Sequence, residues 1–167
     1  MGIIYTTPST VKSEGQMQKA LLHHFDWQRN DCYWNTQIFH WESDFLVVSD
    51  AGYVQEVEIK TSFADWKNDA DKDKFTKAWA KPKWKYIKRF WYAVPSELLD
   101  KHGLPPNLVP NAGVLSVTPR AHGRQPIIKT ALEAPRNAEA QKLTEAKKEQ
   151  LQRSLYFKAV NGFLKKF

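Results

Sequence analysis

Cysteine is almost absent from this chain of 167 residues, and Cys32 is the single example. This scarcity excludes an internal disulfide and any zinc or redox motif built on paired cysteines, and it is typical of a reducing compartment. We therefore expect a cytoplasmic protein. Long apolar runs are also missing, since the longest, Phe90 to Val94, has five residues and a membrane helix needs about 20. No membrane partner is expected, and the first dozen residues hold no signal-peptide core.

Glycine is scarce too, and the seven glycines form neither a P-loop nor a dinucleotide-binding motif. The five histidines lack the spacings of known zinc motifs. The chain does contain 42% hydrophobic and 13% aromatic residues, which is ample for a packed core. These values exclude a disordered chain and predict one folded domain.

Charge is unevenly distributed along the chain, which carries a formal net charge of +7. Residues 1–59 carry −5, 60–89 carry +6, 90–119 carry −1 and 120–167 carry +7. A basic surface favours a polyanion, and nucleic acid is the first to consider. An acidic site inside a positive surface is what a metal-dependent enzyme acting on phosphodiesters needs, although lysine-rich helices that are merely solvated give the same counts.

The first half of the sequence predicts a helix followed by a hairpin. Ser13 and Gln16 form a capping box, so we expect a helix from Glu14 to about Trp27. Residues 28–36 resemble a loop. The stretches 38–48 and 53–60 are rich in β-branched and aromatic residues and flank the turn 50–52, which predicts a hairpin.

The second half predicts two further helices and two strands around a short helix. A second capping signal at Ser62 opens an amphipathic stretch that we expect to stay helical until Pro82. Strands are expected at 89–94 and 113–117, with a short helix at 96–101 between them. A looser segment, 118–136, leads into a final helix from Asn137 to about Gly162.

This order of elements predicts an α/β fold, with a central mixed β-sheet flanked by helices and an extra C-terminal helix. We place the core in residues 1–135. Residues 136–167 are expected to form a basic helical extension that packs on the same domain.

The hairpin brings the candidate catalytic residues together. Alternate residues of a strand share a face, so Glu58 and Lys60 project from the same side. If the turn is a three-residue loop with Gly52 left-handed, Ser49 pairs with Tyr53 and Asp44 lies opposite Glu58, with β-carbons roughly 5 Å apart. A two-residue loop would instead place Asp44 opposite Ile59.

Two carboxylates held this close repel each other unless a cation lies between them. Mg²⁺ binds one or two protein carboxylates and keeps its other positions for water and phosphate oxygens, which suits Asp44 with Glu58. The ammonium of Lys60 can orient or acidify a water, or offset charge on a phosphate under attack. The alternative is structural, with Glu58 and Lys60 as a surface ion pair and Asp44 as an edge cap.

Asp44, the thirteen residues after it and then Glu58-Ile59-Lys60 resemble the PD-(D/E)xK nuclease superfamily, which has the restriction-endonuclease-like fold. The stretch 42–65 and the segments 92–95 and 110–114 are similar to small stand-alone phage and bacterial members, so the resemblance spans residues 13–118. One departure is Ser43, where the name of the motif has proline.

The resemblance implies that Asp44 and Glu58 bind Mg²⁺, or Mn²⁺ as a substitute, with the main-chain carbonyl of Ile59 as a further ligand. It implies that Lys60 is the catalytic lysine, and some members add a glutamate from the leading helix, for which Glu14 is the candidate. An acid in a first turn also simply complements the helix dipole. Glu42 and Glu56 rank behind Asp44 as alternative ligands or partners of Lys60.

Basic and aromatic residues follow the predicted site. Lysines supply phosphate contacts and aromatic rings stack on unpaired bases. We expect Trp66 and Trp79 to pack in the core, whereas Trp84 suits either role. The final helix is a weaker phosphate contact and a candidate surface for a homodimer or another protein. The predicted nucleic-acid-binding residues are Lys67, Lys74, Lys77, Lys81, Lys83, Trp84 and Lys85.

The sequence thus predicts a Mg²⁺-dependent deoxyribonuclease, more an endonuclease than an exonuclease. The resemblance implies a 5′-phosphate product and a phage or bacterial role in DNA repair or recombination. The rival is a non-catalytic DNA-binding or nuclease-interacting protein that keeps the same fold. The sequence does not distinguish duplex, single-stranded or branched DNA, or RNA.

Overall fold

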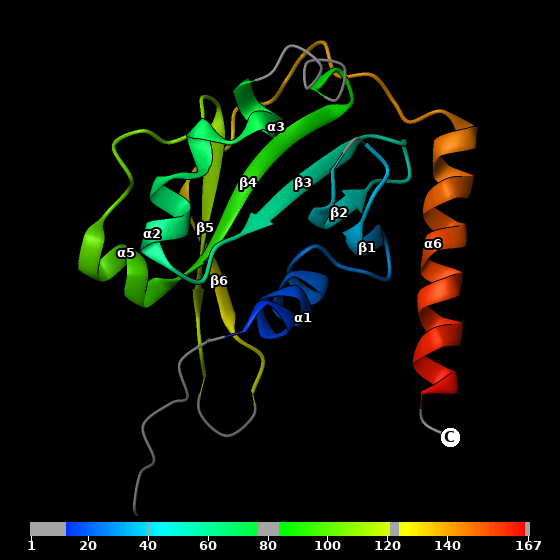
Figure 1. Ribbon diagram of the computed structural model, residues 1–167, viewed down its shortest axis with the longest axis horizontal. Coiled ribbons are helices and arrows are strands. Elements are labelled where there is room, and N and C mark those ends of the chain that lie inside the picture. The colour runs from blue at the N-terminus through cyan, green and yellow to red at the C-terminus, as the bar shows by residue number, and fades with distance from the viewer. Residues whose placement is uncertain (1–12, 40, 77–83, 121–123, 166–167) are drawn as a thin grey trace, which may run out of the picture.

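The computed structural model of the protein describes residues 13–39, 41–76, 84–120 and 124–165 (Figure 1). A six-stranded sheet forms its centre, with the strands side by side in chain order. The first three strands are antiparallel, β3, β4 and β5 are parallel, and β6 returns antiparallel to β5. The strands are β1 (Asp31–Thr36), β2 (Ser43–Val48), β3 (Val54–Ile59), β4 (Ile87–Pro95), β5 (Ala112–Thr118) and β6 (Ile127–Leu132). The predicted α/β fold with a mixed sheet is confirmed.

Helices cover both faces of this sheet. Helix α1 (Glu14–His24) buries Met17 and Leu21 against the face that carries Phe45 and Val57. The other face packs on α2 (Phe63–Lys67), through Trp66, and on the segment that continues as η1 (Asp69–Asp71) and α3 (Asp73–Thr76). Figure 1 shows α1 and the α2–α3 segment on opposite sides of β3 and β4, with α5 (Ser96–His102) beyond α2.

The capping box of α1 forms as predicted, since the Ser13 hydroxyl accepts the Gln16 N–H and the Gln16 side chain accepts the Ser13 N–H. The helix ends at His24, three residues before the expected end at Trp27. Asp26 takes a left-handed backbone with φ of 51°, which a continuing helix does not allow. The expected extension to Trp27 is therefore wrong.

Two edge strands were missed by the sequence analysis. β1 lies where we expected a loop, and Asn35, the residue before its last, has a positive φ of 46° that interrupts the extended backbone. β6 lies in the segment predicted to be loose, and its side chains are mostly exposed, so the alternation of buried and exposed residues is absent.

The long helix predicted after Ser62 is wrong in its extent, because the described part of this segment is divided into α2, η1 and α3. Lys72 adopts an extended conformation, with ψ of 142°, between η1 and α3. The break coincides with Asp69 and Lys72 turning toward an ion-pair cluster with Lys60. Tertiary pairing thus outweighs helical periodicity here.

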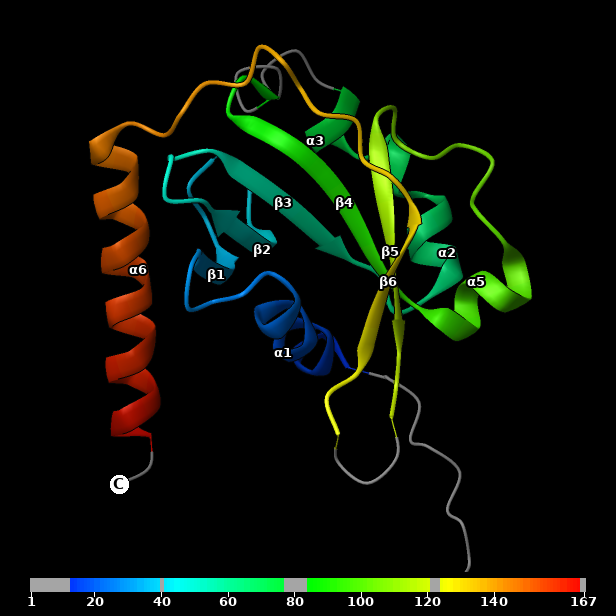
Figure 2. The ribbon, with the colours of Figure 1, turned by 180° about the vertical axis from the view of Figure 1, so that it is seen from behind.

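The last helix, α6 (Glu145–Leu164), begins later than predicted and runs two residues past Gly162. Thr144 caps it by accepting the Lys147 N–H. Asn137, the expected start, instead donates its side-chain amide to the carbonyls of Trp84 and Ile87. Residues 135–144 therefore run along the start of β4 before the helix begins, as the orange-yellow segment of Figure 2 shows.

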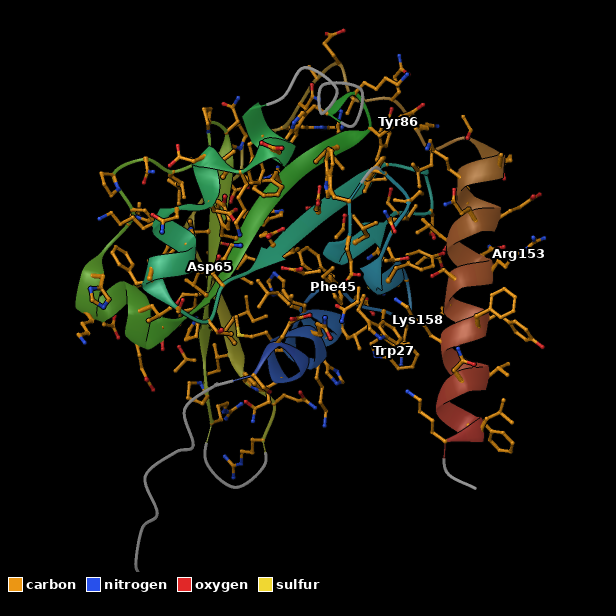
Figure 3. All side chains as sticks on the ribbon, viewed as in Figure 1. Trp27, Phe45, Asp65, Tyr86, Arg153 and Lys158 are labelled. Atoms are coloured by element: carbon orange, nitrogen blue, oxygen red, sulfur yellow. The ribbon has the colours of Figure 1, made fainter. Side chains whose placement is uncertain are left out.

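Helix α6 covers the free edge of β1. Lys158 donates to the carbonyls of Trp34 and Asn35, and Gln150 to that of Gln37. Figure 3 shows Lys158 reaching toward β1 and Arg153 on the outer side of the helix. None of the helices in the described part of the chain has the length and apolar character that a bilayer crossing needs.

Candidate functional site

The β2–β3 hairpin has the register predicted from its turn. Gly52 has φ of 85°, its N–H donates to the Ser49 carbonyl over 2.7 Å, and the Ser49 N–H donates to Tyr53 over 3.0 Å. Val48 pairs with Val54 and Phe45 with Val57, where the ladder ends. Asp44 and Glu58 are the next residues of the two strands, so this register sets them opposite each other on one face.

Asp44 is half-buried at the point where the two strands part. Its Oδ2 accepts the main-chain N–H of Ile59 over 2.7 Å. The carboxylate therefore satisfies a donor that the ladder would otherwise pair with a main-chain carbonyl. This contact fixes Asp44 beside β3 and next to Glu58.

Glu58 and Lys60 share the same face and form a buried ion pair. Lys60 Nζ lies 2.9 Å from Glu58 Oε1, and their side chains are 3% and 5% exposed. Burying two charges costs several kcal/mol per ion unless other groups compensate. The ion pair of the structural alternative therefore forms, and Asp44 caps the strand end as that alternative expected. Only the expected surface location is wrong, since both side chains of the pair are buried.

Two further carboxylates contact Lys60, Asp65 from α2 and Asp69 from η1. Lys60 Nζ lies 2.7 Å from Asp69 Oδ1 and 3.1 Å from Asp65 Oδ2. Lys72 Nζ joins the same two carboxylates, at 3.0 Å from Asp65 and 2.7 Å from Asp69. In Figure 3 Asp65 lies beside α2, facing β3 and β4. Lys60 is therefore held by three carboxylates rather than one.

Tyr92 completes the cluster from the neighbouring parallel strand. It pairs with Glu58 in the β3–β4 register, and its hydroxyl donates to Asp69 Oδ2 over 2.7 Å. Burial raises the pKa of Tyr92, and the adjacent Asp69 charge raises it further. The phenol therefore stays a hydrogen-bond donor throughout the physiological range.

The sequence analysis missed Asp65, Asp69, Lys72 and Tyr92 as members of this cluster. Asp65 and Asp69 are four residues apart after a capping signal, and Lys72 follows Asp69 by three. This spacing of two acids and a base, shortly after the candidate catalytic residue Lys60, was the available signal. The position of Tyr92 depends on the parallel register of β4, which the sequence does not reveal.

The pKa values of this cluster follow from opposing effects. Burial by itself lowers the pKa of Lys60, but the charges of Glu58 and Asp69 outweigh it and raise the pKa above its ordinary value. Burial raises the pKa of Asp65, but hydrogen bonds from Lys72 and Lys60 outweigh that effect and lower it. Lys60 is therefore a permanent cation and cannot serve as a proton acceptor near neutral pH.

The alternative acids lie in different places. Glu56 is completely buried and accepts the Ser43 hydroxyl over 2.9 Å. Glu14, the candidate from the leading helix, is exposed on α1, which packs on the face of the sheet opposite to Glu58 and Lys60, so the expectation that Glu14 faces the core with Met17 and Leu21 is wrong. Gln18 connects it to the site, donating to Glu14 Oε1 over 2.8 Å and to the Asp44 carbonyl over 3.3 Å. Glu42 is exposed next to β2.

The predicted nucleic-acid-binding residues are only partly described. Lys67 and Lys85 are exposed. Lys77, Lys81 and Lys83, like Trp79, lie outside the described residues, as does the side chain of Lys74. Trp84 is half-buried, with its ring 6.0 Å from that of Phe75 and 5.4 Å from that of Phe90. Trp66 is buried, which confirms its expected place in the core.

The chemistry of the donors suits Mg²⁺ in kind, because Asp44, Glu58 and the Ile59 carbonyl offer only oxygen. Within the described ranges, no group of three or more histidine, cysteine, aspartate or glutamate side chains is arranged to hold a metal. The pair of carboxylates belongs to a strongly acidic cluster. Asp44, Glu56, Glu58, Asp65 and Asp69 with Lys60 and Lys72 have a formal charge of −3 when ionised, which a divalent cation would offset.

Comparison with known proteins supports the fold alone. No protein-family model matches the chain, and no curated protein matches it. A similar solved structure is the SPO1766 protein of unknown function from Silicibacter pomeroyi. The two chains have 17% sequence identity and a TM-score of 0.55, over 96% of this chain and 91% of that one.

Proposed function

We propose that this protein is a Mg²⁺-dependent nuclease that hydrolyses DNA phosphodiester bonds at Asp44, Glu58 and Lys60. One observation carries the proposal: Asp44 and Glu58 directly follow the last hairpin pair, Phe45 with Val57, and the Asp44 carboxylate accepts the Ile59 N–H over 2.7 Å. Lys60 lies 2.9 Å from Glu58. A pair of carboxylates beside a fixed cation suits a reaction that needs both a metal and a counter-charge for phosphate. The basic segments of the chain would attract the polyanionic substrate.

Each residue has a distinct role in this proposal. Asp44 and Glu58, with the Ile59 carbonyl, would hold the metal, and Mn²⁺ would substitute for Mg²⁺. Bound there, Mg²⁺ would polarise the phosphoryl oxygen and supply a stronger nucleophile from water. Lys60 stays protonated, so it would offset charge that builds up on the attacked phosphate rather than remove a proton.

The second candidate function is a non-catalytic DNA-binding or nuclease-interacting protein with the same fold. The observation that favours it is the ion-pair cluster itself, because Lys60 already contacts Glu58, Asp65 and Asp69. Such a cluster can serve to specify the fold without any reaction. The two functions differ in whether DNA is cut.

The decisive experiment incubates the full chain with plasmid and single-stranded DNA, in Mg²⁺, Mn²⁺ or chelator. Asp44→Asn keeps an oxygen that can accept the Ile59 N–H but removes the charge, so it tests the metal site without breaking the local contact. We expect Asp44→Asn and Glu58→Gln to lose about 100-fold or more of the cleavage rate. Asp50→Asn, in the exposed turn, is the control and should cleave normally.

Thermal melting provides a readout that does not depend on turnover. Divalent ions should raise the melting temperature of the unmodified protein but not that of Asp44→Asn, since only the former binds them in the folded state. If the protein binds DNA without cutting it, and the affinity does not depend on metal but falls steeply with salt, the result would instead support the non-catalytic DNA-binding protein. Cleavage that survives in Asp44→Asn would overturn the proposed site.

A further inference from the structure

A cavity of about 760 Å³ lies where β4 begins, between α3 and residues 135–138. Its size is within the range of small-molecule sites. Figure 2 shows the segment after β6 passing the start of β4 on its way to α6, which places this wall of the cavity. No residue proposed for catalysis lines it.

Three aromatic rings form one wall. Phe75, Trp84 and Phe90 contact one another with ring centroids 5.4 to 6.0 Å apart. Phe90 is buried, whereas Phe75 and Trp84 are half-buried and line the opening. Flat half-exposed rings of this kind can stack on a base, and such stacking is worth about 1–3 kcal/mol per base.

Among the described residues that line the cavity, the charged ones are basic: Arg136, Arg89 and Lys88. The Lys88 ammonium lies 4.8 Å from the centroid of the Tyr53 ring. Arg89 is fixed in place, since its guanidinium donates to the Ala134 carbonyl over 2.9 Å and pairs with Glu133. Arg136 is exposed at the rim. An aromatic wall with a cationic rim recognises a planar ring joined to an anion, which is the chemistry of a nucleotide.

The wall that carries Arg136 is held against β4. The Asn137 N–H donates to the Lys88 carbonyl over 2.9 Å, and its side-chain amide donates to Trp84 and Ile87 over 3.1 and 3.2 Å. The cavity is therefore shaped before any ligand arrives, which lowers the entropy lost on binding. Asn111 also lines the cavity, is exposed and has φ of 63°. Its side-chain amide is a group that can hydrogen-bond a base edge.

The cavity adjoins the acidic cluster on the same face of the sheet. Phe90 and Tyr92 are two residues apart on β4, roughly 7 Å along a strand, and their rings lie 5.2 Å apart. Tyr92 in turn donates to Asp69, and Ala70, next in the chain, lines the cavity. A strand of DNA with one base in the cavity would thus carry a neighbouring phosphate toward Lys60.

We infer that this cavity binds one unpaired nucleotide, with its base against Trp84 and Phe75 and its phosphate at Arg136. The inference rests on the proposed nuclease function where it assigns the substrate class, namely single-stranded or locally unpaired DNA. A paired base cannot enter, because stacking on Trp84 needs the base outside a duplex. The ligand is either a free nucleotide or a nucleotide unit of a strand, and both share the same recognition chemistry.

The test measures binding in chelator, where no cleavage interferes. The full chain is titrated calorimetrically with thymidine monophosphate, with a single-stranded oligothymidylate and with a duplex of equal length. Arg136→Glu is compared with Arg153→Glu, a control that makes the same change of charge on the outer side of α6. A second cavity variant, Asn111→Gly, removes the amide side chain, and glycine tolerates the positive φ at this position. We expect Arg136→Glu to weaken single-strand binding at least tenfold, and Arg153→Glu less than threefold.

Single-strand binding at least tenfold tighter than duplex binding, with the loss confined to the cavity variants, supports the inference. Binding of thymidine monophosphate as tight as that of the oligonucleotide, and lost in Arg136→Glu, supports the free nucleotide as ligand. Equal losses in Arg136→Glu and Arg153→Glu, or duplex bound as tightly as single strand, would overturn it. Nucleotide binding without cleavage would sink the nuclease proposal alone. Binding of both thymidine monophosphate and the oligonucleotide that is unchanged in Arg136→Glu would sink the cavity inference alone.

Discussion

Lys60 illustrates how a buried charge is tolerated in this protein. Its side chain is 3% exposed, and its ammonium contacts Glu58, Asp65 and Asp69. Those carboxylates differ in burial, because Asp69 is fully buried whereas Asp65 is 51% exposed. When a buried carboxylate is deleted, no water takes its place beside the Lys60 ammonium, and the charge is left without compensation. When an exposed carboxylate is deleted, water solvates the ammonium in its place. The two aspartates should therefore contribute unequally.

Asp69→Ala should lower the free energy of unfolding by about 3–5 kcal/mol, the usual loss when one partner of a buried ion pair is deleted. The deletion also removes the acceptor of the Tyr92 hydroxyl. Asp65→Ala, the matched control, should cost less than about 1 kcal/mol. Urea unfolding curves measure both values. Similar losses in the two variants would contradict the assignment of Asp69 as the main counter-charge.

The lowered pKa of Asp65 predicts a pH dependence. Its ordinary value is 3.8, and the folded value is lower because of Lys72 and Lys60. The stabilisation is then fully present above pH 3.8 and is lost as the pH falls through the folded pKa. The unmodified protein should exceed Asp65→Asn in stability by a constant amount, under about 1 kcal/mol, near neutral pH. Denaturation at a series of pH values should show that this difference in stability becomes smaller in acid. A difference that becomes larger in acid would contradict the lowered pKa of Asp65.

The β2–β3 hairpin is the element on which the site depends. Strand pairs are fixed by the turn, and a shift of one residue would move every side chain to the other face. Gly52 supplies the left-handed conformation of the turn, with φ of 85°. The opposition of Asp44 to Glu58 is therefore a consequence of one glycine three residues after Ser49.

Gly52→Ala should destabilise the protein by about 1 kcal/mol, because an L-residue with a side chain adopts this φ at a cost. The new methyl would meet Lys142 and Lys148 only at 3.5 Å, an ordinary contact, so the loss is conformational. Gly15→Ala is the control in the first turn of α1, where an added Cβ meets nothing within 4 Å. It should raise stability by about 0.5–1 kcal/mol, and thermal melting of both variants checks the opposite signs.

At the scale of the whole molecule, α6 is joined to the domain by few apolar side chains. Leu151 is 1% exposed and belongs to the main core cluster, whereas Tyr156, Phe157, Phe163 and Leu164 are each more than half exposed. Polar side chains from the helix cover the β1 edge. The expected homodimer or protein partner at this helix stays a prediction.

Leu151→Ala should cost about 2–5 kcal/mol, because it opens a cavity in the core beneath α6. Leu164→Ala is the matched control, since Leu164 is 63% exposed, and it should change stability by less than about 0.5 kcal/mol. Urea unfolding gives the two values, and limited proteolysis should cut the segment before α6 faster only in Leu151→Ala. Equal sensitivity in both variants would show that α6 is not anchored by Leu151.

Local features were predictable from short stretches of sequence. The capping box at Ser13 and the turn at Gly52 depend on neighbours within three or four residues, so their residues predicted them correctly. The hairpin register followed from that turn, and with it the shared face of Asp44, Glu58 and Lys60. Local backbone preferences and period-two alternation are sufficient for such features.

The surroundings of these residues depend on how distant segments of the chain pack together. Asp69, Lys72 and Tyr92 meet at Lys60 because a broken helix packs beside a parallel strand, and neither the break nor the register is encoded within a short window. The same holds for β6 and for the aromatic cavity, whose walls come from segments some 50 residues apart. Burial, and the pairing of charges that burial requires, depends on contacts distant in sequence, so it becomes visible only when the chain is folded.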